Sequence, residues 1–179
     1  MRLSVCAMEM SPRPRLAGRM ADTSSLGLSL LLVAGTATGL QAGTYFTWAT
    51  GVMPGLAKVD DRTFVHAMQR MNVAIVNPLF LSTFLGAPLL AGAAIATSHG
   101  DALPWVIAGA GMAVATAVIT MAGNVPLNDA LAAAGPIDGI EDLAAVRKRF
   151  ESRWVWLNAS RAVTSTASLA ALLWAAARS

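Results

Sequence analysis

The spacing of charged residues constrains the fold of this chain more than any other feature. Asp, Glu, Lys and Arg are absent from residues 23–57, 71–100, 102–128 and 162–177. A helix that crosses a lipid bilayer needs about 20 mostly apolar residues. The first three uncharged stretches are longer than this, and the fourth reaches that length when its start is placed at Trp154. We therefore predict an integral membrane protein with four transmembrane helices.

Composition supports this class and excludes others. Only 13% of the 179 residues are charged, whereas a typical soluble domain has about 25%. The net charge of +3 does not indicate nucleic-acid binding, because the basic residues collect at the predicted membrane edges and form no basic face with interleaved aromatic residues. The single cysteine, Cys6, cannot form a disulfide within the chain. Membrane lipid is the predicted partner, and nucleic acid is not.

The expected fold class is all-α, an integral membrane antiparallel four-helix bundle. Residues 1–25 form a polar tail that we expect to be disordered, and residues 26–178 form the transmembrane domain. Short connections force successive helices to alternate in direction. The predicted spans are about 26–48, 72–97, 104–122 and 154–177.

Tryptophan positions agree with four spans, because this residue favours both membrane interfaces. Trp48, Trp154 and Trp156 fall on the side of the first and third loops, and Trp105 and Trp174 fall on the opposite side. The first and third loops also carry more lysine and arginine than the opposite side. The positive-inside rule then favours a multi-pass protein of the cell membrane whose first and third loops are cytoplasmic.

Three local patterns lead to further expectations. Gly35, Gly39 and Gly43 recur every four residues, which predicts close helix packing within the bundle, with a homodimer through these glycines as the alternative. The first helix should end near Met53-Pro54-Gly55, because proline ends helices. Residues 58–70 have amphipathic spacing, which fits either a solvated helical turn or an interfacial helix.

Polar side chains are concentrated at one end of the predicted bundle. Such side chains are costly at membrane depth unless they are paired, and they usually mark function or helix contacts. We therefore predict one polar pocket that opens toward the side of the first and third loops. The residues that we assign to it for substrate binding are Gln41, Gln69, Asn72, Asn77, Asn124, Asn128, Trp154 and Asn158.

Arg161 gives the sharpest signal. Trp154, Asn158 and Arg161 are spaced at i, i+4 and i+7, so they share one helix face. At about 1.5 Å per residue, Arg161 lies roughly 10 Å deeper than Trp154. A guanidinium at that depth needs an anion, carbonyls or water. Either it snorkels or bonds structurally to Asn124, Asn128 or Asp129, or it clamps an anion or phenolate.

Other chemistries fit poorly. The two histidines, His66 and His99, lie on opposite sides of the predicted membrane, so they cannot share one metal or haem across about 30 Å. A glycine-rich phosphate loop and a nucleophile elbow are both absent. His66, near Asp60 and Asp61, is either a general base or an ordinary interfacial residue.

The polar residues also carry a resemblance to a known family. Taken together they resemble the anthrone oxygenase-like family of small four-helix membrane proteins, over about Leu28 to Trp174. The segments that carry it are Gly43-Thr44-Tyr45-Phe46, Met53-Pro54-Gly55-Leu56, Gln69 with Asn72 and Asn77-Pro78, Asn124 to Asn128, and Trp154 with Asn158 and Arg161.

This resemblance implies a cofactor-independent monooxygenase that oxidises an anthrone to an anthraquinone with O₂, without a metal or flavin. In our hypothesis Arg161, Asn128 and Asn158 hold the phenolate, and His66 or Asp129 is the base. The lipophilic aromatic substrate is the expected small-molecule partner. The alternative is a non-enzymatic membrane component that binds a lipophilic molecule or a partner subunit. A transporter has no support, since no inverted repeat or paired broken spans occur.

Overall fold

The computed structural model describes the backbone of residues 14–179 and the side chains of residues 25–179, and the described part is helical without strands. The longer helices are α1 (Pro14–Thr47), α3 (Asp61–Ala74), α4 (Pro78–Ile95), α5 (Leu103–Ile119), α6 (Val125–Ala133) and α7 (Leu143–Ala176). The short elements are η1 (Trp48–Val52), α2 (Met53–Leu56), η2 (Gly100–Ala102), η3 (Thr120–Asn124) and η4 (Ile137–Gly139).

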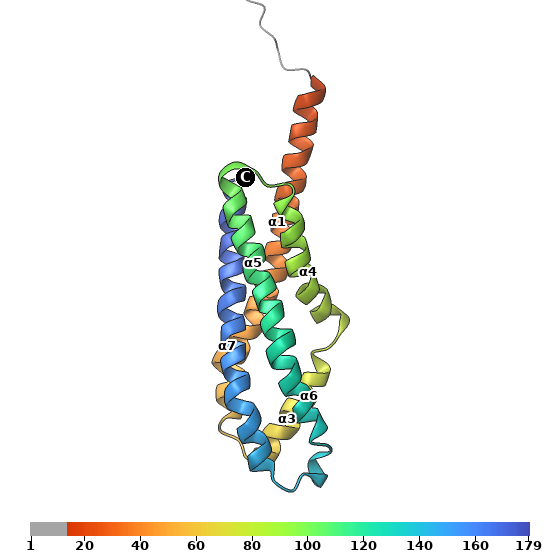
Figure 1. Cartoon of the computed structure of the whole chain (residues 1–179), viewed down its shortest axis with the longest axis vertical. Coiled ribbons are helices and arrows are strands. Elements are labelled where there is room, and N and C mark those ends of the chain that lie inside the picture. The colour runs from red at the N-terminus through yellow and green to blue at the C-terminus, as the bar shows by residue number, and fades with distance from the viewer. Residues whose placement is uncertain (1–13) are drawn as a thin grey trace, which may run out of the picture.

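The helices α1, α4, α5 and α7 run side by side along most of the molecule (Figure 1). α1 contacts α4 and α7, and α5 contacts the same two helices. α3 and α6 lie together at the end opposite the C-terminus (Figure 1). In the described part of the chain, three continuous helical segments are long and apolar enough to cross a membrane: Ser25–Leu56, Pro78–Ile95 and Gly100–Ala133. The chain is therefore a helical protein of the membrane class.

The helix boundaries depart from the expected ones at several places. α1 begins at Pro14, well before the expected boundary at residue 26, and residues 1–13 of the expected tail lie outside the described residues. The second predicted span is interrupted at residues 75–77, where the side chain of Asn77 accepts a hydrogen bond from the Phe80 N–H and starts α4 afresh.

The first helix ends at Leu56, directly after the predicted Met53-Pro54-Gly55. Pro54 itself lies within the last helical turn, two residues after the π-helical turn η1. The same arrangement recurs where η3 precedes Pro126. Proline normally clashes with the carbonyl four residues before it, and a local π turn relieves this clash in membrane helices.

Two apolar clusters hold the helices together. At the end near the C-terminus, small and branched side chains such as Ala34, Ala91, Val106 and Leu172 are almost completely buried between the four helices. We call the second group, at the other end, the cap cluster. It consists of Met53, Phe64, Val65, Met68, Leu131, Phe150 and Trp154.

Aromatic contacts lie at both ends, as the tryptophan pattern predicted. The rings of Trp48 and Trp154 are 5.1 Å apart between centroids, and those of Trp105 and Trp174 are 6.0 Å apart. The amphipathic segment forms α3, which buries Phe64 in the cap cluster.

The N-terminus of α3 is fixed by Asp60. Its carboxylate accepts hydrogen bonds from the Thr63 hydroxyl at 2.7 Å and the Thr63 N–H at 3.0 Å. These bonds hold the pKa of Asp60 below its usual value. The cap therefore contributes stability above the ordinary pKa of an aspartate, and that contribution is lost as pH falls through the lowered value.

The close helix packing that the glycine spacing predicted is found at only one of the three glycines. A Cβ built on Gly39 would lie 3.7 Å from Leu169 of α7, so this glycine faces a neighbouring helix. A Cβ on Gly35 or Gly43 would meet nothing within 4 Å. Close packing through all three glycines is therefore wrong, and a homodimer through the stripe stays a prediction.

Tight contacts between helices occur instead at Gly109 in α5 and at Gly123 in η3. A Cβ on Gly109 would lie 2.9 Å from both Cγ and Cδ2 of Leu172, a fully buried side chain, and 3.3 Å from the backbone oxygen of Ser168. We expect Gly109→Ala to lower the free energy of unfolding by about 1–3 kcal/mol, because a packed neighbour has to move. Thermal unfolding in detergent measures this. Gly111→Ala, where a Cβ meets nothing within 4 Å, is the control and should be neutral or stabilising.

Candidate ligand cavity

A cavity of about 300 Å³, next to the cap cluster, is lined by residues of α1, η1, α3, α4, η3, α6 and α7 and by the break between α3 and α4. This volume is at the lower end of the range for small-molecule pockets, about 300–1,000 Å³. Its polar lining comes from Thr44, Tyr45, Asn72, Thr120, Asn124, Asn128, Asn158 and Arg161. Its apolar lining comes from Trp48, Ile75, Val76, Phe80, Leu81, Phe84, Met121, Val125 and Trp154.

Three of its walls are places where a helix departs from regular geometry. η1 begins at Trp48 and η3 ends at Asn124, and both residues line the cavity. Ile75 and Val76, in the break between α3 and α4, line it as well. Such π turns occur frequently at functional sites. The irregular geometry therefore coincides with the cavity and is not scattered along the helices.

Arg161 lies deep in this cavity and has no counter-ion. Its side chain extends from α7, the residue is only 6% exposed, and Nη2 donates to Oδ1 of Asn158 at 3.0 Å. The guanidinium carbon is 4.4 Å from the ring centroid of Tyr45 and 5.5 Å from that of Trp154. Within the described residues, no carboxylate lies at ion-pair distance from Arg161. Its positive charge is held by an amide and two aromatic faces, so it remains available to an anion.

The residues around Arg161 are fixed by their own hydrogen bonds. Nδ2 of Asn158 donates to the backbone oxygen of Tyr45 at 3.0 Å, and Nε1 of Trp154 donates to Oδ1 of Asn128 at 2.9 Å. The Tyr45 hydroxyl donates to Oε1 of Gln41 at 2.5 Å. α1, α6 and α7 are thereby tied together around the guanidinium, which gives a preorganised group of donors.

Among the side chains that the structure describes, four buried atoms have no hydrogen-bond partner, and all four belong to residues that line the cavity. They are Nδ2 of Asn72, Nδ2 and Oδ1 of Asn124, and Nε of Arg161. Asn124 is only 1% exposed. A buried polar group without a partner costs about 1–3 kcal/mol, so native proteins rarely keep one without a reason. Three unused donors and one unused acceptor around one cavity are the pattern of a ligand site.

Aromatic rings form much of the remaining wall. Phe80 and Phe84 stack with centroids 5.9 Å apart and planes 9° apart, and Tyr45, Trp48 and Trp154 complete the set. The sequence analysis did not assign Tyr45, Trp48 or the two phenylalanines to the site. Tyr45 lay within one of the quoted motifs, whereas the other three carried no signal that distinguished them from lipid-facing residues.

Six of the residues predicted for the site meet in this cavity: Asn72, Asn124, Asn128, Trp154, Asn158 and Arg161. Gln69 does not line it, because its Nε2 donates to the backbone oxygens of Leu131 and Gly135, both at 3.0 Å. Asn77 caps α4. Gln41 is buried beside the cavity, where it accepts from Tyr45 and donates to Thr83 at 2.7 Å.

The two residues proposed as a base lie outside the cavity. His66 is exposed on α3, where its Nε2 accepts a 3.4 Å hydrogen bond from Arg70, and Asp129 is exposed on α6. The ionisable side chains that line the cavity are those of Tyr45 and Arg161. No lining residue offers a carboxylate or an imidazole.

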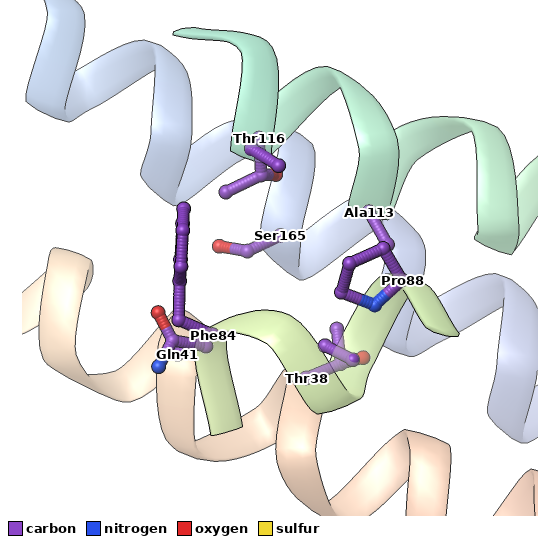
Figure 2. A pocket seen from close by; sticks show the side chains of 9 residues that line it. Thr38, Gln41, Phe84, Pro88, Ala113, Thr116 and Ser165 are labelled. Carbon is purple, nitrogen blue, oxygen red and sulfur yellow. The ribbon is translucent and has the colours of Figure 1, made fainter. Parts of the chain in front are cut away.

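A much smaller void lies beside the cavity and shares Phe84 with it (Figure 2). Gln41, Thr38, Thr116, Ser165 and Pro88 face one another across it (Figure 2). Its volume is about 10 Å³, which is the minimum that one water molecule requires. It cannot hold an organic ligand, so the larger cavity is the candidate site.

The fold and the cavity together define the class of this protein. This is a helical membrane protein with an aromatic cavity, in which a buried arginine and unpaired amides face an apolar space. The family model for anthrone oxygenase matches residues 64–171, well over half of the chain. The chain belongs to the anthrone oxygenase family. No curated protein and no solved structure matches it.

Proposed function

We propose that this protein is an integral membrane oxygenase that oxidises a lipophilic aromatic substrate of the anthrone type within the described cavity. The observation that carries the proposal is Arg161, which is buried among aromatic rings without a carboxylate partner and beside unpaired amide groups. The match to the anthrone oxygenase family supports the reaction class. The proposed reaction uses no cofactor, as the resemblance of the sequence implied.

The proposed chemistry uses charge stabilisation. The acidic CH₂ group of an anthrone gives a proton to water and leaves an anthrolate, whose negative charge is shared between that carbon and the oxygen of the opposite ketone. Arg161 and the amide of Asn124 favour this anion, since a nearby opposite charge promotes the ionised form. Preorganised donors of this kind usually supply the largest single contribution to catalysis. His66 and Asp129 have no role in this proposal, because they lie outside the cavity.

The oxidation itself balances with one molecule of O₂. The anthrolate carbon reduces O₂ and bonds to it, and a proton converts the product to a hydroperoxide. Loss of water from the hydroperoxide leaves the new carbonyl. One oxygen atom ends in the quinone and the other in water, which is the stoichiometry of a monooxygenase without an external reductant.

We further propose that α1, α4, α5 and α7 all cross the membrane as an antiparallel bundle. α7 is less apolar than the other three, because Arg161 and several hydroxyl residues lie on it. These polar residues face inward: Asn158, Arg161, Ser165 and Ser168 are all buried. The basic first and third loops then support a cytoplasmic location for the cavity end.

The test of the enzymatic proposal uses purified protein in liposomes with 1,8-dihydroxyanthrone in air. Formation of the anthraquinone faster than in protein-free liposomes, with one O₂ consumed per quinone, supports it. A rate equal to that of protein-free liposomes, together with saturable binding of the anthraquinone, would favour the alternative, a non-enzymatic protein that binds lipophilic molecules.

The unpaired amide of Asn124 leads to a prediction about stability. We expect Asn124→Leu to raise the free energy of unfolding of the ligand-free protein by about 1 kcal/mol, because an unsatisfied buried group is removed. The same change should weaken binding of 1,8-dihydroxyanthraquinone. Thermal unfolding in detergent, with and without the quinone, measures both effects. Asn128→Leu is the matched comparison and should destabilise, since Asn128 accepts from Trp154. Destabilisation by both variants would argue against a ligand site at Asn124.

A further inference from the structure

Packed apolar side chains of the cap cluster lie on the loop side of the cavity. On three chain segments that line the cavity, a residue of the cap cluster lies nearer to the loops than the cavity residues do. Met53 follows Trp48 toward the first loop, and Leu131 follows Asn128 toward the third. On α7, which begins after the third loop, Phe150 precedes Asn158 and therefore lies nearer to that loop. This placement argues against the expected opening toward the loops, because packed apolar side chains lie on that side of the cavity.

The cavity is open at its side. Three of its lining residues are exposed although they are apolar: Val76 is 65% exposed, Met121 59% and Leu81 37%. Val76 lies in the break between α3 and α4, a segment that projects from the side of the helices in Figure 1, and Leu81 lies in the first turn of α4. Met121 lies in η3, the continuation of α5. The opening is thus between the start of α4 and the end of α5.

The surfaces next to this opening are apolar on both helices. On α4, Leu79 is 77% exposed and Leu85 55%. On α5, Val118 is 57% exposed and Val114 49%. Both helices belong to segments long and apolar enough to cross a membrane. With α4 and α5 crossing the membrane as proposed above, the opening faces the hydrocarbon of the bilayer and not water.

We propose that the ligand enters and leaves this cavity sideways, from the bilayer, through the opening between α4 and η3. The ligand class is then a membrane-dissolved lipophile that is uncharged on entry and carries oxygen acceptors for Arg161 and Asn124. Its ionisation takes place inside the cavity. The inference rests on the proposed ligand site but not on the oxidation reaction.

Quenching of Trp154 fluorescence tests this route without any catalytic step. Trp154 lines the cavity and is only 4% exposed. The probe protein keeps it as the only tryptophan, with Phe in place of Trp48, Trp105, Trp156 and Trp174. It is placed in phosphatidylcholine liposomes with brominated acyl chains, and iodide serves as the quencher in water. We expect brominated lipid to quench Trp154 more strongly than iodide.

Two paired variants show whether quenching passes through the opening. Val76→Phe/Met121→Phe narrows it, and Val73→Phe/Val118→Phe adds the same rings at exposed positions that do not line the cavity. The first pair should lose most of the lipid quenching and the second should retain it. Stronger quenching by iodide, or equal loss in both pairs, would overturn lateral entry. If the single-tryptophan protein does not fold, the protein that also keeps Trp48 serves in the same comparison.

The outcome is separable from that of the oxidation assay. Strong quenching of Trp154 by brominated lipid, without oxidation of an anthrone, would support lateral entry and argue against the proposed reaction. Oxidation of an anthrone together with stronger quenching by iodide would support the reaction and argue against lateral entry.

Discussion

Replacement of Arg161 by methionine is expected to lower the rate of anthrone oxidation by about 100-fold or more. Removal of one preorganised donor from a developing oxyanion typically costs 10²–10³-fold, and Arg161 is the one cation that lines the cavity among the described residues. Methionine keeps much of the apolar stem, so the cavity should persist. The rate of quinone formation in liposomes measures the effect.

The control for this change is Arg153→Met. Arg153 lies on the same helix but is exposed and does not line the cavity. Its replacement should leave the rate close to that of the unchanged protein. Thermal unfolding should show that the Arg161 variant is at least as stable as the parent, because a buried charge without a counter-ion has been removed. A large loss of stability with an unchanged rate per folded molecule would assign Arg161 a structural role instead.

The second large effect is expected at Arg147, where α7 is attached to the first loop. Its guanidinium donates to Glu151 at 2.7 Å, to Asp61 at 3.1 Å and to the backbone oxygen of Val59 at 2.8 Å. It also lies 4.4 Å above the ring of Phe64 in the cap cluster. The bond to Glu151 is the main cause of the raised pKa of Arg147, so the charge persists over the whole accessible pH range.

Arg147→Met should lower the free energy of unfolding by about 2–4 kcal/mol, because it leaves two carboxylates and several loop carbonyls without their donor. Unfolding in detergent, followed by circular dichroism, measures the loss. Arg62→Met is the control: its ion pair with Asp138 is exposed, and such pairs contribute about 0–1 kcal/mol. Equal effects of the two variants would mean that the first loop is not anchored through Arg147.

The sequence placed several polar residues at one end of the predicted bundle, because uncharged stretches and short loops set which helix ends lie together. The structure brings four of them, Asn124, Asn128, Asn158 and Arg161, to one cavity. The direction of each side chain around its helix was less predictable. Gln69 was grouped with them, but it bonds to loop carbonyls instead.

Helix irregularities were the main features that the sequence did not predict. The predicted third span ended at residue 122, whereas the π turn η3 carries the helix through Pro126 into α6, and the π turn η1 before Pro54 was not predicted either. A π turn depends on a shift of one residue in the hydrogen-bond pattern, which leaves little trace in composition or periodicity. The lateral opening was missed for a related reason, because exposed Val76 and Met121 resemble any lipid-facing residue until the cavity behind them is seen.

The central claim is that Arg161 and Asn124 receive the oxygens of a flat aromatic ligand inside the membrane. An experimental structure of the protein with the unreactive product 1,8-dihydroxyanthraquinone tests it most directly. We predict that the tricycle lies in the cavity against Phe80 and Phe84, with ligand oxygens within about 3.2 Å of Arg161 and Asn124. An empty cavity at saturating quinone, or Arg161 turned outward to a lipid phosphate, would contradict the account.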